Sequence, residues 1–74
     1  MALMEKRSMK LDGHRTSVAL EPEFWVVVER AALLKGESLP KYIATVGKAK
    51  PAERNLASAL RLEALRLASV TAAA

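Results

Sequence analysis

The side chains best suited to chemistry lie at alternate positions of one short stretch, HRTSVAL at residues 14–20. An extended strand directs successive side chains to opposite faces, so Arg15, Ser17 and Ala19 share one face. A guanidinium donates paired hydrogen bonds to planar acceptors, and a hydroxyl both donates and accepts. The opposite face is apolar or β-branched, with Thr16, Val18 and Leu20. This pattern predicts a half-buried strand that presents a polar recognition surface.

Catalysis and metal binding are not expected from the neighbouring groups. Asp12, His14 and Ser17 lie too close along one strand to converge as a catalytic triad, and no oxyanion motif accompanies them. His14 has no acidic or cysteine partner at ligand spacing, and the chain has no cysteine. The carboxylates of Glu21 and Glu23 flank a predicted helix start. The sequence therefore predicts a protein that is not an enzyme and has no cofactor or metal.

The size and charge of the chain limit its possible fold, partners and location. The chain has 74 residues, which is one domain at most, and a formal net charge of +4, which favours a polyanionic partner. A chain this small rarely buries a sufficient core by itself, and without cysteines it cannot form disulfides. Oligomerisation is therefore the expected way to complete the core. There is no apolar run long enough to span a membrane and no secretory signal, so a cytoplasmic location is expected.

Helical patterns follow the strand. Pro22 suits a first helical position and Gly36 suits a left-handed C-cap, so a helix is predicted over residues 22–35. Ser38 is a good N-cap for a second helix, which Gly47 is expected to end. The predicted buried positions of the two helices are Phe24, Trp25, Val28, Ala31, Ala32, Leu39, Tyr42, Ile43 and Val46.

A third helix is predicted over residues 52–70, after a basic turn in which Pro51 can start it. One stripe of this helix carries Leu56, Leu60, Leu67 and Val70. Leu62 and Leu65 lie on roughly the opposite side, so the helix is expected to contact two surfaces. No internal repeat is evident in the chain.

A single strand leaves its backbone donors and acceptors unpaired, which favours pairing with the same strand of a second copy across a two-fold axis. Residues 1–13 are then a basic N-terminal arm, residues 14–47 the core, and residues 48–74 a linker and C-terminal helix. An alternative is that Asp12-Gly13 forms a hairpin turn, which would pair Met9 with Thr16 and Lys10 with Arg15.

The order of these features resembles the ribbon-helix-helix family of DNA-binding proteins. The similarity covers RTSVALEPEFWVVVERAALLKGESLPKYIATV, including the turn Gly36-Glu37-Ser38. The segments KRSMKLDGHRTSVALEPEFW, SLPKYIATV and NLASALR are similar to a bacterial, mostly uncharacterised subfamily. The resemblance implies a mainly α ribbon-helix-helix homodimer with an added C-terminal helix. It also implies a small, repressor-like transcriptional regulator that binds double-stranded DNA.

The resemblance assigns roles to particular residues. The outward strand residues Arg15, Ser17 and Ala19 are expected to contact bases in the major groove. The start of the second helix, at Ser38, Leu39 and Lys41, is expected to bind a phosphate. The arm is expected to add phosphate contacts through Lys6, Arg7 and Lys10. The expected dimer core consists of Thr16, Val18, Leu20, Phe24, Trp25, Val28, Tyr42, Ile43 and Val46.

Two apolar side chains, Val26 and Leu33, fall on the otherwise polar side of the first helix. The third helix is expected to cover them with Leu62 and Leu65; the alternative is a docking face for another dimer or a partner protein. A second function follows from that alternative, namely an antitoxin-like interaction module that uses the third helix. It ranks lower because antitoxins of this fold usually carry a longer tail.

Overall fold

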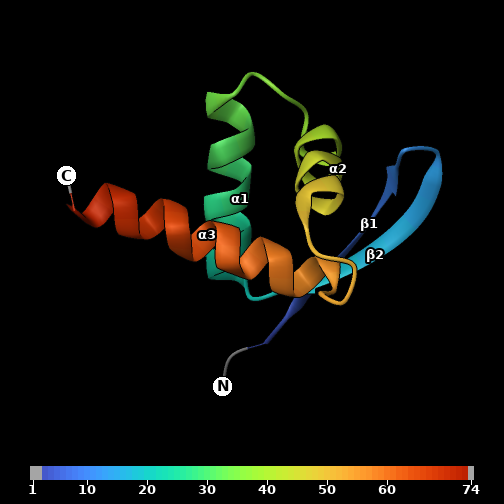
Figure 1. The fold of residues 1–74 in the computed structure, drawn as a ribbon, viewed down its shortest axis with the longest axis horizontal. Coiled ribbons are helices and arrows are strands. Elements are labelled where there is room, and N and C mark those ends of the chain that lie inside the picture. The colour runs from blue at the N-terminus through green and yellow to red at the C-terminus, as the bar shows by residue number, and fades with distance from the viewer. Residues whose placement is uncertain (1–2, 74) are drawn as a thin grey trace.

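The computed structural model describes residues 3–73, with side chains described as far as residue 68. The chain begins with β1 (Glu5–Leu11) and β2 (His14–Leu20) and continues with α1 (Pro22–Leu34), α2 (Leu39–Ala49) and α3 (Leu56–Ala73). α1 and α2 lie beside each other, α3 crosses α1, and the two strands extend outward past α2 (Figure 1).

β1 and β2 form an antiparallel hairpin within one chain. Asp12 and Gly13 form its two-residue turn with φ values of 50° and 84°. Positive φ at both central positions defines the type I′ turn, whose twist matches that of the flanking strands. The register pairs Met9 with Thr16 and Lys10 with Arg15, as the hairpin alternative predicted.

Two predictions are therefore wrong. Residues 5–11 are a strand and not part of a basic arm, and β2 is not a lone strand. The prediction of an obligate homodimer assumed that β2 had no partner in its own chain. β1 supplies that partner, so pairing with a second copy is not needed to satisfy this edge of β2.

α1 begins at Pro22 as predicted and ends at Leu34, one residue before the predicted end at residue 35. Pro22 occupies its first turn, and the backbone carbonyl of Glu21 accepts hydrogen bonds from Phe24 and Trp25. At the other end, Gly36 has φ 67°. The N–H of Gly36 donates to the carbonyl of Leu33, at 3.0 Å. The N–H of Glu37 donates to the carbonyl of Ala32, also at 3.0 Å. These bonds form a Schellman motif.

α2 ends later than predicted, and α3 starts later than predicted. α2 starts after Ser38, whose hydroxyl caps it, but continues through Gly47 to Ala49. It stops where Lys50 becomes extended, because a residue before a proline is disfavoured in helical conformation. α3 starts at Leu56 and not at Pro51, because the side chain of Asn55 accepts the N–H of Ser58 at 2.7 Å. Val70 lies outside the residues whose side chains are described.

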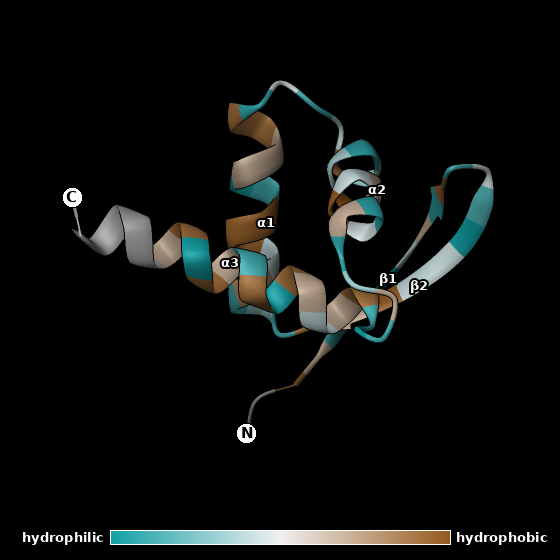
Figure 2. Cartoon of the chain, in the orientation of Figure 1, coloured by the Kyte–Doolittle hydropathy of each residue, from teal (hydrophilic) through white to brown (hydrophobic). Residues whose placement is uncertain are grey.

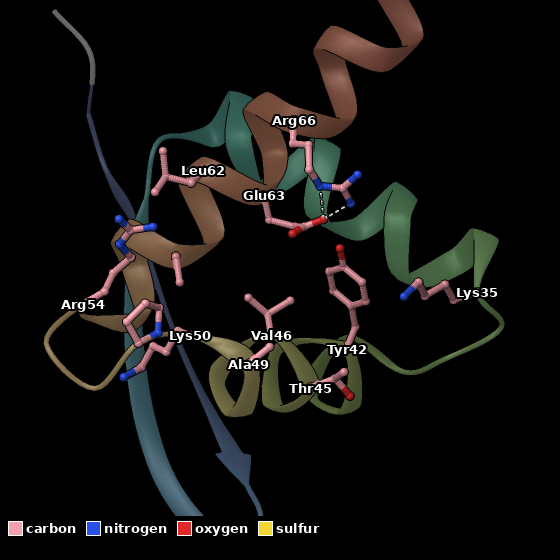
Figure 3. Close-up of a pocket in the computed structure, with 12 residues that line it drawn as sticks. Lys35, Tyr42, Thr45, Val46, Ala49, Lys50, Arg54, Leu62, Glu63 and Arg66 are labelled. Carbon is pink, nitrogen blue, oxygen red and sulfur yellow. Dashed lines mark hydrogen bonds and ion pairs between the residues drawn. The ribbon is translucent and has the colours of Figure 1, made fainter.

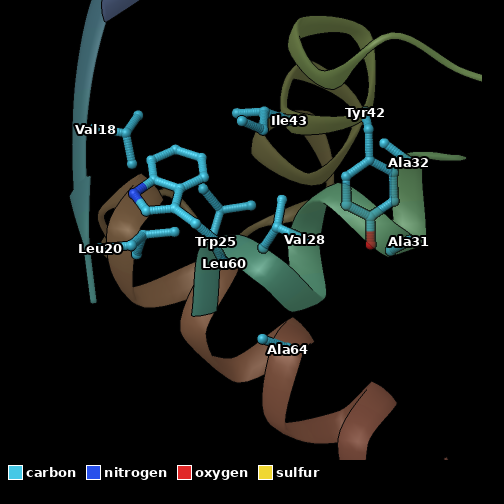
Figure 4. Packing of buried hydrophobic residues seen from close by; sticks show 10 residues of the cluster. All are labelled: Val18, Leu20, Trp25, Val28, Ala31, Ala32, Tyr42, Ile43, Leu60 and Ala64. Carbon is cyan, nitrogen blue, oxygen red and sulfur yellow. The ribbon is translucent and has the colours of Figure 1, made fainter. Parts of the chain in front are cut away.

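The core draws on β2 and all three helices of this chain. The largest fully buried side chains are Trp25, Leu20, Ile43, Leu60 and Val28. Figure 4 shows the Trp25 ring packed between β2 and the helices, with Leu60 of α3 beside it. α3 thus closes the core from within the chain. Three residues of the predicted dimer core are only half-buried, namely Thr16, Phe24 and Val46.

The helices within residues 3–73 include none that is long and apolar enough to cross a membrane.

Candidate nucleic-acid interface

One face of the hairpin gathers most of the predicted contact residues. Alternation directs every second side chain of each strand outward, away from the core. The residues on this outer face are Lys6, Ser8, Lys10, Arg15, Ser17 and Ala19. All are exposed except Ala19, which is half-buried. The face carries three cations and no carboxylate, and the hydrophilic part of the hairpin stands clear of the helices (Figure 2).

The register places like charges directly opposite each other. Lys10 pairs with Arg15 across the strands, and both side chains are exposed. Like charges in directly opposed positions destabilise a sheet by a few tenths of a kcal/mol or more. Two residues farther from the turn on each strand, the hydroxyls of Ser8 and Ser17 lie 3.0 Å apart. The paired cations therefore do not stabilise the hairpin, and they concentrate positive charge next to its turn.

Ser8 is the member of this face that sequence reasoning missed. Its signal was present, because residues 6, 8 and 10 alternate ahead of the Asp12-Gly13 turn just as residues 15, 17 and 19 alternate after it. Treating residues 1–13 as an arm hid that alternation.

Arg7 lies on the opposite face of β1, contrary to its predicted phosphate contact. Its guanidinium donates to the carboxylates of Glu5 and Glu29, the latter at 2.8 Å. It also lies 4.5 Å from the centroid of the Trp25 ring. The hydrogen bond to Glu29, and then that to Glu5, raises the pKa of Arg7. Arg7 therefore joins β1 to α1 and is not available on the outer face.

Trp25 also holds β1 in place. Its indole N–H donates to the backbone carbonyl of Glu5 at 2.8 Å, and its ring is buried. Glu21, next to the start of α1, accepts a hydrogen bond from Arg61 of α3 at 2.9 Å. That bond is the main cause of the lowered pKa of Glu21. These contacts fix the hairpin on the helices, so its outer face is presented on a supported element.

The start of α2 lies away from the hairpin turn. The other end of α2 is beside that turn, because Lys48 pairs with Asp12 at 3.6 Å. The Ser38 hydroxyl accepts the N–H of Lys41 at 3.3 Å. Pro40 has no N–H, so the first turn offers an anion the N–H groups of Ser38 and Leu39. Lys41 is exposed there, and its cation favours the same kind of ligand.

A groove of about 480 Å³ separates α2 from α3. Figure 3 shows Tyr42 and Val46 of α2 facing Leu62, Glu63 and Arg66 of α3, with Glu63 and Arg66 paired. Tyr42 is buried, and burial, with a smaller effect of Glu63, raises the pKa of its hydroxyl. The rim carries basic side chains, at Lys35, Lys50 and Arg54.

The third helix does not cover the apolar residues of α1, contrary to prediction. The exposed fractions are 53% for Val26, 79% for Leu33, 45% for Leu62 and 54% for Leu65. α3 instead turns Leu60 and Ala64 toward the core, which leaves Leu62 and Leu65 on its outer side. Its second apolar side therefore has no partner among the described residues of this chain.

The family model described as a ribbon-helix-helix domain matches residues 4–68. The chain belongs to the ribbon-helix-helix family. No match was found among curated proteins or among solved structures.

Ribbon-helix-helix domains are generally DNA-binding transcription regulators, and they typically bind DNA as dimers. The family fold is a binding fold and not a catalytic one. The match includes all of β1 and most of α3, so both belong to the ribbon-helix-helix domain. β1 is therefore part of this domain, although the sequence analysis predicted that residues 1–13 form a basic N-terminal arm.

Proposed function

We propose that this protein binds double-stranded DNA sequence-specifically through the outer face of its hairpin, and acts in the bacterial cytoplasm as a small, repressor-like transcriptional regulator. The major groove of B-DNA is about 12 Å wide and admits a two-stranded ribbon. The observation that carries the proposal is the opposition of Lys10 to Arg15 on a face without carboxylates. A phosphate backbone relieves the repulsion between these two side chains.

Base readout is assigned to β2. The Arg15 guanidinium has the geometry for two hydrogen bonds to guanine, and the Ser17 hydroxyl donates to or accepts from a base edge. Ala19 suits contact with a thymine methyl group. From β1, Ser8 adds a second hydroxyl 3.0 Å from that of Ser17.

Phosphate contacts are assigned to cations and helix N–H groups. Lys6 and Lys10 flank the readout residues on the outer face. Ser38, Leu39 and Lys41 form the anion site at the start of α2. Arg7 is left out because Glu5 and Glu29 hold its guanidinium on the other face.

The proposal is tested with Arg15→Ala. The probe is the duplex that the intact chain selects from a pool of random 20-bp duplexes. The affinity of the variant is expected to fall roughly 5- to 150-fold, which corresponds to the loss of about 1–3 kcal/mol of base discrimination. Binding is measured by fluorescence anisotropy at constant salt, and folding by circular dichroism.

The matched control is Arg30→Ala, which removes an exposed arginine from α1, away from the hairpin. Its affinity is expected to stay within about twofold of that of the intact chain, since it removes a distant, screened charge. An equal loss in both variants, or no loss in Arg15→Ala, would remove Arg15 from readout.

The exposed Leu62 and Leu65 favour a second candidate function, an antitoxin-like interaction module. Exposed leucines on one side of a helix suit an apolar protein partner. This function would require that the chain show no salt-sensitive DNA binding. It would also require a stoichiometric protein partner whose binding is lost in Leu65→Glu.

A further inference from the structure

The groove between α2 and α3 shares no lining residue with the proposed DNA contacts. It has a volume of about 480 Å³ and is lined by side chains of both helices, of the loop between them and by Lys35. Small-molecule sites in proteins typically have volumes of about 300–1,000 Å³. The groove is therefore large enough for a small organic ligand.

The lining of the groove has an excess of positive charge. Lys35, Lys50 and Arg54 form no ion pair with any residue that the structure describes. Among the described residues of the lining, Glu63 is the only carboxylate, and it pairs with Arg66. Three cations are thus left without a partner, and their charge favours an anionic ligand.

The three unpaired cations lie at the two ends of the groove. Lys50 and Arg54 lie at one end, and Lys35 lies at the other (Figure 3). Between the ends, Val46 of α2 and Leu62 of α3 line the groove with apolar side chains. A ligand that spans the groove therefore meets positive charge at each end and an apolar surface in the middle.

Tyr42 adds a hydrogen-bond donor at the same end as Lys35. Its side chain is only 3% exposed, and its hydroxyl points into the groove toward Glu63 and Arg66 (Figure 3). The hydroxyl makes no hydrogen bond to any described residue, and the Lys35 ammonium lies 5.6 Å from the centroid of the ring. A buried ring thus holds a donor without a partner in a fixed position.

From this arrangement we infer that the groove binds an elongated organic dianion with an apolar middle. One anionic group lies between Lys50 and Arg54, and the other accepts the Tyr42 hydroxyl beside Lys35. Tyr42 and Ala49 are seven residues apart on α2, which is about 10 Å along the helix axis, so a rigid two-ring frame has a suitable length. This site is separate from the proposed DNA contacts and does not depend on them.

Charge complementarity favours a small dianion over a second copy of this chain as the occupant. The chain has a formal net charge of +4, so a second copy would bring further positive charge to the groove. A small dianion instead neutralises both ends of the groove and leaves its apolar middle covered.

The probe for the test is naphthalene-2,6-dicarboxylate, which has a carboxylate at each end of a rigid two-ring frame. It is titrated into the intact, isotope-labelled chain and followed by NMR. The dissociation constant is expected to lie below about 1 mM, as is usual for a ligand of this size. The amide signals of Tyr42, Ala49 and Leu62 are expected to shift, and those of Lys10 and Arg15 to stay in place.

The matched probe, 2-naphthoate, has the same frame and only one carboxylate. It is expected to bind about tenfold more weakly, since it loses one charged hydrogen bond. Tyr42→Phe removes only the hydroxyl, and this variant is expected to bind the two probes with equal affinity within about twofold. A purely structural role of Tyr42 would instead weaken the binding of both probes alike.

Arg54→Gln tests the other end of the groove. Its affinity for both probes is expected to fall roughly fivefold, the upper range for an exposed ion pair. The matched control is Arg30→Gln, which changes an exposed arginine of α1 outside the lining, and its affinity is expected to stay within about twofold. Circular dichroism checks that each variant is folded.

Several results would overturn the dianion site. These are a dissociation constant above about 1 mM, equal binding of the two probes by the intact chain, or equal losses in Arg54→Gln and Arg30→Gln. Groove signals that shift with protein concentration when no probe is present would assign the groove to a second copy. The DNA titration of Arg15→Ala is independent of these results, so failure of the dianion site leaves the proposed function standing, and the reverse also holds.

Discussion

Neighbouring basic residues of β1 have different environments because a strand alternates its faces. Lys6 and Lys10 are exposed on the outer face, whereas Arg7 lies between two carboxylates and over the Trp25 ring. An arginine suits that inner position, because its planar guanidinium forms hydrogen bonds in its plane while it stacks on an aromatic ring. Charge alone therefore does not identify which basic side chains of β1 lie on the outer face.

Tyr42 provides a test of the core at the scale of one residue. Burial raises the pKa of its hydroxyl above the ordinary value of 10.0, and Glu63 raises it further. Below about pH 10 both folded and unfolded chains keep the proton, so this group does not change stability there. As the pH rises from about 10 toward the folded pKa, the unfolded chain loses the proton first and stability decreases.

The measurement is the absorbance of tyrosinate near 295 nm, which reports Tyr42 alone because the chain has one tyrosine. The midpoint is expected to lie above pH 10 in the folded chain and to return to about 10 in concentrated urea. A folded midpoint at or below the urea value would contradict the burial of this hydroxyl.

At the scale of elements, the hairpin depends on its turn and on its contacts with α1. The turn needs positive φ at two successive residues, and Gly13, with φ 84°, adopts it without steric cost. The hydrogen bond from Trp25 to Glu5 joins residues twenty apart in sequence. Local geometry thus forms the ribbon, and α1 holds its far end.

Gly13→Ala is expected to destabilise the chain by about 1–2 kcal/mol, because a Cβ is unfavourable in the left-handed region. Urea unfolding followed by the fluorescence of Trp25 measures the change, and this indole contacts β1 directly.

Gly47→Ala is the matched control. Gly47 lies within α2, where alanine is favoured over glycine by about 1 kcal/mol, and its added Cβ would lie 3.4 Å from Leu56 Cδ1. This variant is expected to be neutral or slightly stabilised. Equal losses in both glycine variants would indicate that the turn conformation is not the cause.

At the scale of the whole molecule, the core and the cationic face lie on opposite sides of one ribbon. The inner side packs on helices of the same chain, and the outer side carries three of the chain's twelve lysines and arginines without a carboxylate. The side chains of the cationic face therefore take no part in packing the core.

The salt dependence of the proposed DNA binding tests whether the outer face contacts phosphates. Each phosphate contact contributes a slope of about 0.9 to the fall of log K with log salt concentration. Lys6→Ala and Lys10→Ala are each expected to reduce the slope by about one, and together by about two. Anisotropy titrations over a series of NaCl concentrations measure it.

Lys35→Ala serves as the control because Lys35 lies between α1 and α2, 5.6 Å from the Tyr42 ring centroid, and is outside the outer face. Its slope is expected to match that of the intact chain. Unchanged slopes in the Lys6 and Lys10 variants would exclude these two side chains from phosphate contact.

The sequence by itself determined features that depend on near neighbours. The alternation of β2, the start of α1 at Pro22, its termination before Gly36 and the cap at Ser38 all follow from local steric and hydrogen-bonding rules. The ribbon-helix-helix resemblance and the outward orientation of Arg15, Ser17 and Ala19 were predictable for the same reason.

Only the tertiary structure showed that β2 has a partner strand within its own chain. The local signal at Asp12-Gly13 left open whether β2 has such a partner. Contacts across twenty or more residues, from Trp25 to Glu5 and from Arg7 to Glu29, favour the hairpin. The tertiary structure also showed which side of α3 faces the core. A helix with leucines on two sides can bury either side, and the positions of the neighbouring elements determine which one is buried.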